Sequence, residues 1–311
     1  MDVSIIIPTY NRLWSLPKAI KSCRETKCIT EIIVVDDGST DGTGEWLKLQ
    51  DAIVVVSQSN QGKDWAVNNG FKIAKGKYIK FLDSDDYYPL NSIDNQFDVA
   101  EKTNADIVVA GINVVNEKDE VLFENLNVLT NDFIAQQLGE ENGSHYSAFL
   151  FRKDFIKDIP HRQEFGSVDD RKFILEVALK NPSVSFLNEN GLFHLKHTNE
   201  RLQKLSGIKE TVYHFHILTI YKQTINQLAN SGQLTNRRIK AVSNILWHLS
   251  HWIAKANVNE AISVYNWIKE LNPSFVIPEK GGIGFLYNIL GFEKTEKILT
   301  VRRKLKFGFW N

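Results

Sequence analysis

The feature that most constrains the fold is an alternation of short apolar runs with segments of helical spacing over the first 110 residues. The apolar runs lie at residues 5–7, 32–35, 53–56, 78–82 and 106–110. Helices are predicted between them, most clearly over residues 64–75, where Gly76 closes the segment. Strands that alternate with helices in this way form an α/β fold, with a mostly parallel sheet that helices cover on both faces. The runs are therefore expected to be buried strands, with ligands bound at their carboxyl ends.

The pattern changes further along the chain. Residues 114–123 predict a hairpin, residues 147–151 and 183–187 predict two more strands, and residues 170–179 predict a helix. From about residue 200 the spacing is helical, and the glycines at 281–284 are expected to interrupt it. The clearest apolar stripe of this part is Ile239, Val242, Leu246, Leu249 and Ile253. We therefore expect two domains, residues 1–200 with the sheet and residues 201–311 as a C-terminal helical region.

Polar side chains follow three of the predicted strands directly. These are Pro8, Thr9, Tyr10 and Asn11 after the first run, Asp36 and Asp37 after the second, and Asp83, Ser84, Asp85 and Asp86 after the fourth. Each segment alone also suits an ordinary turn or a helix cap. Parallel strands end at one edge of a sheet, however, so the three loops together predict a nucleotide site. The carboxylates of residues 83–86 repel one another unless a cation neutralises them, and Mg²⁺ or Mn²⁺ prefers such oxygen ligands.

Charge and motifs exclude several other classes. Lys plus Arg equals Asp plus Glu at 37 each, so no overall positive field favours a nucleic-acid partner. Neither a Gly-x-Gly-x-x-Gly motif after the first strand nor a P-loop motif is present, so phosphates would need the metal ion instead. Two cysteines, no secretion signal and no apolar run of spanning length favour a cytoplasmic protein, with peripheral membrane contact as a further option.

Four segments in order resemble family 2 glycosyltransferases. They are Ile5-Ile6-Ile7-Pro8-Thr9-Tyr10-Asn11, Val34-Val35-Asp36-Asp37-Gly38-Ser39-Thr40-Asp41, Asn60-Gln61-Gly62 and Phe81-Leu82-Asp83-Ser84-Asp85-Asp86. The resemblance covers residues 1–110 and implies a GT-A fold, a nucleotide diphosphate sugar donor, and inversion at the anomeric carbon. It favours UDP as the nucleotide and implies Mn²⁺ or Mg²⁺ as the cofactor.

The same resemblance implies roles for individual residues. Residues 8–11, chiefly Thr9 and Tyr10, would line the nucleoside pocket, and either Asp36 or Asp37 would hold the base. In the Asp-x-Asp segment 83–85, which includes Ser84, Asp83 would face the ribose and Asp85 the metal. Where the family often has Ala-Arg-Asn after Gly62, this chain has Ala66-Val67-Asn68, and Lys63 is the candidate substitute for the missing arginine as a phosphate contact.

An inverting transferase also needs a base for the acceptor hydroxyl. The family often supplies it as the Asp of Glu-Asp-x-x-Phe, and Asp169-Asp170-Arg171-Lys172-Phe173 matches that segment, with Asp170 as the base. The alternative role for Asp170 is to stabilise a helix dipole from the first turn. The segment 193–197 resembles a region that touches the metal or the diphosphate, which makes His197 a candidate metal ligand and His194 its alternative.

The last residues, 302–310, combine four basic with three aromatic side chains. Such a tail suits an anionic membrane surface, where a polyprenyl-diphosphate-linked glycan acceptor would reside, although it also suits docking on its own domain. We therefore expect a glycosyltransferase of cell-surface polysaccharide assembly. The alternatives are a catalytically silent sugar-nucleotide-binding module and a nucleotidyltransferase, which would want a glycine-rich basic loop near the first strand.

Overall fold

The structure is a computed structural model, and it describes residues 1–140, 143–198 and 208–307. The chain forms two compact units. The first comprises residues 1–133 and 141–201, and the second comprises residues 134–140 and 202–311. The predicted tail beyond Arg302 lies outside the residues whose side chains the structure describes. Among the described helices, none is both long and apolar enough to span a bilayer.

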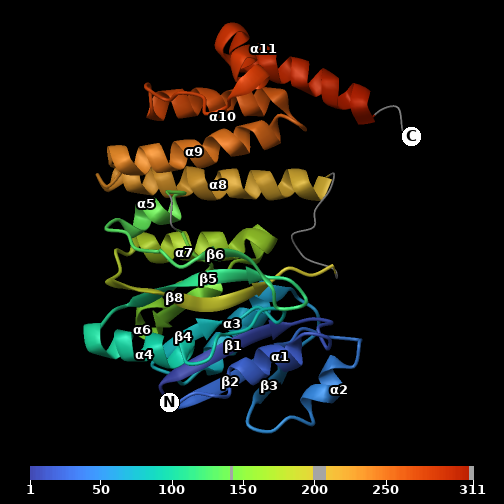
Figure 1. Cartoon of the computed structure of the whole chain (residues 1–311), viewed down its shortest axis with the longest axis vertical. Helices are drawn as coiled ribbons and strands as arrows, with labels where there is room; N and C mark the ends of the chain where they lie inside the picture. The colour runs from blue at the N-terminus through green and yellow to red at the C-terminus, as the bar shows by residue number, and fades with distance from the viewer. Residues whose placement is uncertain (141–142, 199–207, 308–311) are drawn as a thin grey trace. The chain divides into compact units, whose positions relative to one another are not determined.

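The first unit is built on an eight-stranded sheet with the order β3-β2-β1-β4-β7-β5-β6, in which β8 pairs with β5 (Figure 1). The strands are β1 (Val3–Thr9), β2 (Thr30–Asp36), β3 (Val54–Ser57), β4 (Tyr78–Phe81), β5 (Ile107–Val115), β6 (Val121–Asn125), β7 (Phe149–Arg152) and β8 (Val184–Leu195). Strands β1 to β4 pair in parallel, as do β5 and β8, whereas β7 is antiparallel to β4 and β5, and β6 to β5. The predicted mostly parallel sheet is confirmed, with an antiparallel strand, β7, inserted at its centre.

Helices flank this sheet. They are α1 (Leu16–Ser22), α2 (Thr43–Leu47), α3 (Lys63–Ile73), α4 (Ser92–Thr103), α6 (Lys153–Ile156) and α7 (Asp169–Leu179), with 3-10 turns η1 (Tyr146–Ala148) and η2 (Gln163–Val168). The sequence did not predict α4 because Asp94 and Gln96 occupy its buried face, so the apolar spacing of a helix is missing there.

Close packing seats α3 on the sheet. Residue 70 is a glycine, and a Cβ atom there would lie 2.6 Å from Ile6 Cγ2 and 3.2 Å from Val35 Cγ2. The helix axis therefore lies closer to β1 and β2 than it could with any larger residue at position 70. The first turn of α3 is consequently fixed beside the carboxyl ends of these strands.

One strand differs from its prediction. The run at 53–56 was expected to be buried, but Val54 of β3 is 43% exposed. This strand is the edge of the sheet and pairs only with β2 among the described strands, so a continuous apolar run was not a reliable sign of burial on both faces.

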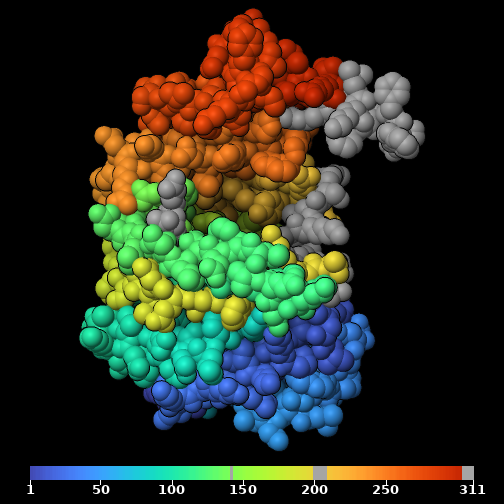
Figure 2. Space-filling view, viewed as in Figure 1, coloured from blue at the N-terminus to red at the C-terminus, as the bar shows by residue number. Residues whose placement is uncertain are grey.

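The second unit is helical, with α5 (Phe133–Gln137), α8 (Ile208–Asn230), α9 (Asn236–Ile253), α10 (Val258–Leu271) and α11 (Gly281–Phe307). The predicted stripe on α9 is confirmed from Val242 to Ile253, while Ile239 is only half-buried. Helix α9 packs against α8 and α10, which Figure 2 shows as adjoining layers from yellow to orange. The glycines at 281–284 mark the start of α11, so the predicted interruption of the helical half lies between α10 and α11, and a further break comes inside α11 at Gly291, where φ is 75°.

Candidate active site

The three predicted polar loops follow neighbouring strands. Strand β1 lies between β2 and β4, and all three run in parallel, so their carboxyl ends form one edge of the sheet. In the register, Thr9 pairs with Asp36 and Ile6 with Phe81. Segments 8–11, 36–42 and 83–86 therefore meet at this edge.

The loop after β1 is fixed by hydrogen bonds to the loop after β2. Asn11 adopts a positive φ of 52°, its N–H donates to Ser39 Oγ at 2.9 Å, and its Oδ1 accepts from the Thr40 N–H at 2.8 Å. Before it, Thr9 is 3% exposed, and its buried hydroxyl has no hydrogen-bond partner in the described part of the chain. Tyr10 is 43% exposed. The loop thus carries a buried hydroxyl on Thr9 and, on the next residue, an exposed aromatic ring.

Asp36 and Asp37 are both buried, but they make different contacts. Asp36 Oδ1 accepts from the Ser39 N–H at 3.1 Å, within its own loop. Asp37 Oδ1 accepts from the Gln58 side-chain amide and the Gln61 N–H, at 2.7 and 2.8 Å. Its Oδ2 accepts from the Gly62 N–H at 2.8 Å. Asp37 therefore ties the end of β2 to the segment that leads into α3.

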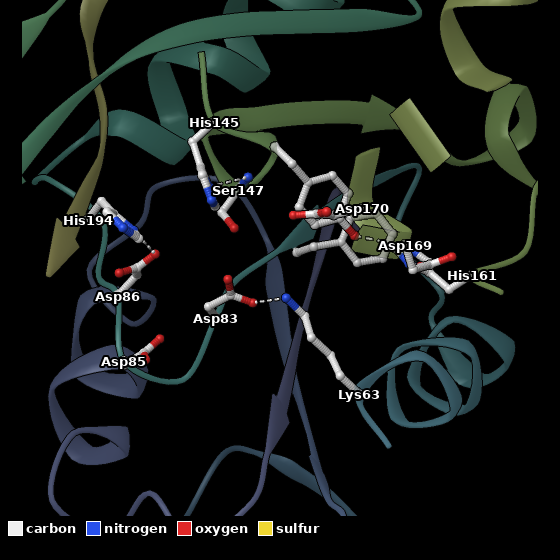
Figure 3. Close-up of polar contacts among 12 residues, drawn as sticks. Lys63, Asp83, Asp85, Asp86, His145, Ser147, His161, Asp169, Asp170 and His194 are labelled. Atoms are coloured by element: carbon white, nitrogen blue, oxygen red, sulfur yellow. Dashed lines mark hydrogen bonds and ion pairs between the residues drawn. The ribbon is translucent and has the colours of Figure 1, made fainter. Parts of the chain in front are cut away.

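Lys63 begins α3 directly after Gly62, and its Nζ lies 2.5 Å from Asp83 Oδ1 (Figure 3). Burial lowers the pKa of Lys63, but the charges of Asp83, Asp170 and Asp85 raise it by more, so the ammonium is stabilised. Burial disfavours the charged form of Asp83 too and so raises its pKa. The charges of Lys63 and His145 lower this pKa by more, so the carboxylate stays ionised. Lys63 is therefore the cation that the candidate donor-binding and catalytic carboxylates share.

Asp85 lies next to His197, a histidine that follows the end of β8. Its Oδ2 lies 3.0 Å from His197 Nε2 and 3.9 Å from Arg12 Nε. Two ligands of one octahedral ion, each about 2.1 Å from the metal, lie about 3 Å apart. Asp85 and His197 are therefore close enough to hold one divalent cation together, and the cation would replace the hydrogen bond between them.

The other candidate histidine has a different partner. His194 Nδ1 lies 3.1 Å from Asp86 Oδ2, and Asp86 Oδ1 accepts from the Leu195 N–H at 2.9 Å. Asp86 is 1% exposed, and burial raises its pKa. These contacts anchor the acidic loop to β8. Ser15, which precedes α1, donates from its Oγ to the Ser84 carbonyl at 2.8 Å and so ties the same loop to the start of that helix.

Asp169 and Asp170 open α7 in two different environments. Asp169 is 1% exposed; its Oδ1 accepts from the Arg162 N–H at 2.5 Å, and its Oδ2 contacts His161 Nδ1. Asp170 is half-buried, and its Oδ1 accepts a hydrogen bond from the adjacent Arg171 N–H at 2.7 Å. Figure 3 shows Asp170 in the same group as Lys63 and Asp83. Of the two neighbours, Asp170 is the one available to a ligand.

Sequence reasoning missed two contributors to this site. His145 lowers the pKa of Asp83, and its ring stacks on that of His194 with centroids 5.2 Å apart. No local motif marks His145; only the insertion of β7 beside β4 brings it here. Asp64, the second residue of α3, lies against Asp169, whereas in the sequence it only marked the start of the predicted helix 64–75.

Comparison with known sequences gives a consistent result. Residues 4–159 match the family model described as glycosyl transferase family 2. The chain is 28% identical over 209 residues to the glycosyltransferase GlyG of Streptococcus pneumoniae, which covers 60% of this chain and 68% of GlyG. It is 27% identical over 252 residues to EpsJ of Bacillus subtilis, an uncharacterized glycosyltransferase, which covers 72% of this chain and 73% of EpsJ.

Solved structures show the same fold. TarS 1-349 of Staphylococcus aureus in complex with UDP aligns with a TM-score of 0.59 at 18% identity, covering 96% of this chain and 91% of that one. The mannosyltransferase PcManGT from Pyrobaculum calidifontis, in complex with GDP-Man and Mn²⁺, aligns with a TM-score of 0.53 at 14% identity, covering 97% and 87%. The expected GT-A fold is thereby confirmed.

Proposed function

This chain belongs to glycosyl transferase family 2, and from that premise we propose that it is an inverting, metal-dependent enzyme that transfers a sugar from a UDP-sugar to a hydroxyl group of a glycan acceptor. The observation that carries the proposal is the position of Lys63, whose Nζ lies 2.5 Å from Asp83 Oδ1 and whose pKa is also raised by the charges of Asp170 and Asp85. The carboxylates that we assign to donor binding and catalysis would thus share one cation at the carboxyl-terminal edge of the sheet, where ligands bind in such folds.

The donor would lie across the three loops. We assign Thr9 and Tyr10 to the nucleoside, and Asp36 or Asp37 to the base. Thr9 Oγ1 is a buried hydroxyl without a hydrogen-bond partner among the residues that the structure describes, and a ligand oxygen or nitrogen would satisfy it. Asp83 would face the ribose, and Lys63 would contact a phosphate by exchanging Asp83 for the more highly charged diphosphate.

Asp85 and His197 would hold Mn²⁺ or Mg²⁺. When bound, the cation neutralises the diphosphate charge that develops as the sugar leaves. Asp170 would accept the proton of the acceptor hydroxyl while that oxygen attacks the anomeric carbon from the face opposite the diphosphate. An ordinary carboxylate is a weak base for an alcohol, so the proton moves as the sugar–phosphate bond breaks, when the hydroxyl becomes more acidic.

We further propose that the acceptor is a polyprenyl-diphosphate-linked glycan of cell-surface polysaccharide assembly. The catalytic domain, residues 1–200, would act on it at the cytoplasmic face of the membrane. The support is the basic and aromatic sequence of residues 302–310. Deletion of residues 302–311 is expected to reduce binding to phosphatidylglycerol vesicles without changing the melting temperature of the sheet unit. Unchanged vesicle binding would contradict the membrane role.

The donor is tested by thermal shift with UDP, GDP, dTDP, CDP and their common sugars, each with Mn²⁺, Mg²⁺ or EDTA. A ligand that binds only the folded chain raises its melting temperature by mass action. We expect the largest shift with UDP or a UDP-sugar, and its loss in EDTA. A larger shift with another nucleotide would overturn the donor assignment, and binding without sugar transfer would favour a silent module.

A further inference from the structure

A second group of ionisable side chains lies next to Asp170, on three different elements. Asp64 comes from the first turn of α3, Asp169 from the first turn of α7, and His161 from the segment before η2. They are 8%, 1% and 7% exposed, and their nitrogen and oxygen ligand atoms all lie within 4.8 Å of one another. Nothing in the proposed transfer reaction uses Asp64, although it adjoins Lys63.

Hydrogen bonds extend this group into the core. His161 Nδ1 contacts Asp169 Oδ2, and His161 Nε2 lies 3.0 Å from the hydroxyl of Tyr146. A carboxylate on Nδ1 selects the tautomer that donates there, so Nε2 accepts the Tyr146 proton. The His161 ring also stacks on Phe173 of α7, with centroids 4.5 Å apart. The imidazole is therefore fixed on both edges and on one face.

The main chain of the same segment is fixed as well. Asn68, one turn after Asp64 on α3, donates from its side chain to the His161 carbonyl at 2.8 Å and accepts from the His161 N–H at 3.0 Å. Helix α3 thus holds residue 161 directly, and residue 161 holds Asp169. Asp64 supplies a second link from α3 to the same carboxylate.

We propose that Asp64 is a positioning residue for Asp170, which acts through Asp169 and the first turn of α7. The inference rests on the function proposed above for Asp170. Asp169 and Asp170 are consecutive, so contacts that fix the Asp169 carboxylate also fix the backbone that carries Asp170. Misplacement of a reacting group by about 1 Å can cost about 100-fold in rate, so such support has a measurable effect on turnover.

The link from Asp64 to Asp169 requires a proton, because two facing carboxylates repel each other. The pKa of Asp64 is raised to about 8; burial is the largest cause, the charge of Asp169 acts in the same direction, and Lys63 opposes both. Asp170 and a hydrogen bond with Asp169 act in the same upward direction. At neutral pH Asp64 is therefore mostly the neutral acid, and its carboxyl group, with a ligand atom within 4.8 Å of that of Asp169, is the one that would supply the proton.

A metal ion is the competing explanation for two acids and a histidine at this spacing. Both oxygens of Asp169 already accept hydrogen bonds, and both ring nitrogens of His161 have partners. The nearby guanidinium of Arg162 is paired with Glu176 at 3.0 Å, so it does not neutralise Asp64. A cation would have to displace this network, whereas a single proton completes it.

The test compares Asp64→Asn with Asp64→Ala, because an amide replaces the donated hydrogen and a methyl group does not. Asp98→Ala, an exposed carboxylate on α4, is the matched control. We expect Asp64→Ala to lower kcat about tenfold or more, with unchanged donor KM and unchanged metal-dependent UDP binding. Asp64→Asn is expected to stay within about threefold of the wild type at pH 7.

The pH profile separates this role from a merely structural one. Wild-type kcat is expected to decline with a midpoint near pH 8, as Asp64 ionises and the bond to Asp169 is lost, and Asp64→Asn is expected to lack that decline. A kcat for Asp64→Ala equal to that of Asp98→Ala would overturn the positioning role. So would an alkaline decline that persists unchanged in Asp64→Asn.

A stability measurement keeps the inference separate from the proposed function. The folded pKa of Asp64 lies above its unfolded value of 3.8, so wild-type stability falls as pH rises between about 4 and 8, and Asp64→Asn lacks this component. Identical pH dependence of the two melting temperatures would overturn the shared proton. A melting temperature that EDTA lowers in the wild type alone would replace the proton with a metal. Absence of sugar transfer by the wild type, with the stability difference present, would contradict the proposed function and the role of Asp170 but leave the shared proton established.

Discussion

Two acidic clusters in the sheet unit solve the same electrostatic problem in different ways. At the end of β4, Asp83 is kept ionised because Lys63 and His145 outweigh the effect of burial on its pKa. At the start of α7, Asp169 faces Asp64, whose pKa is raised to about 8. The first cluster is neutralised by cations and the second by a proton. Residue type alone therefore does not decide whether a buried carboxyl group can bind metal and phosphate or serve as a hydrogen-bond donor.

The largest expected effect is on nucleotide binding, and it comes from a change in the first cluster. Asp85→Ala removes the carboxylate that faces His197 and is expected to abolish the metal-dependent thermal shift with UDP. Asp64→Ala, at the second cluster, is expected to keep that shift. Equal loss of nucleotide binding in both variants would mean that the two clusters do not have separate functions.

The next effect is on turnover. Asp170→Asn keeps the shape of the side chain but removes its basicity, so kcat is expected to fall about 100-fold or more, the usual scale for loss of a general base. Metal-dependent UDP binding should be retained, since Asp170 is assigned to the acceptor hydroxyl. Normal turnover by this variant would show that another group takes the proton.

A smaller effect sharpens the role of the shared cation. Lys63→Met removes the main influence that lowers the pKa of Asp83, so this carboxylate is expected to protonate at a higher pH. Asp83 contributes as an anion only above its folded pKa, and that contribution is lost as pH falls. UDP affinity, measured by calorimetry from pH 5 to 8, should therefore decline at a higher pH than in the wild type. Lys72→Met, an exposed lysine on the same helix, is the control and should leave the profile unchanged.

The smallest effect gives the baseline for both clusters. Lys77 and Glu101 form an exposed ion pair, with Nζ 2.6 Å from Oε1 and side chains that are 50% and 40% exposed. Solvent screens such pairs, so Lys77→Met is expected to change the unfolding free energy by no more than about 1 kcal/mol. A larger loss in urea denaturation would mean that exposed pairs matter as much here as the buried carboxyl groups.

Sequence predicted the parts of the site that local patterns encode. The polar residues after β1, β2 and β4 could be found because strand ends and turn residues are short-range signals. The position of His145 depends on the antiparallel pairing of β7 with β4. This pairing is non-local, so no local sequence pattern predicts it. Asp64 and Asp169 are 105 residues apart, as their numbers show. Their shared proton follows from burial and contact, which the sequence alone does not contain.

The glycine at residue 70 affects both clusters, because it sets the position of the helix that carries Lys63 and Asp64. Helix α3 carries Lys63 toward one cluster and Asp64 toward the other, and its seat on Ile6 and Val35 leaves no room for a side chain at position 70. A single methyl group there would shift both functional side chains at once, since close-packed interiors transmit displacement. Natural variation at this buried position is therefore constrained by ligand binding and by the placement of the base together.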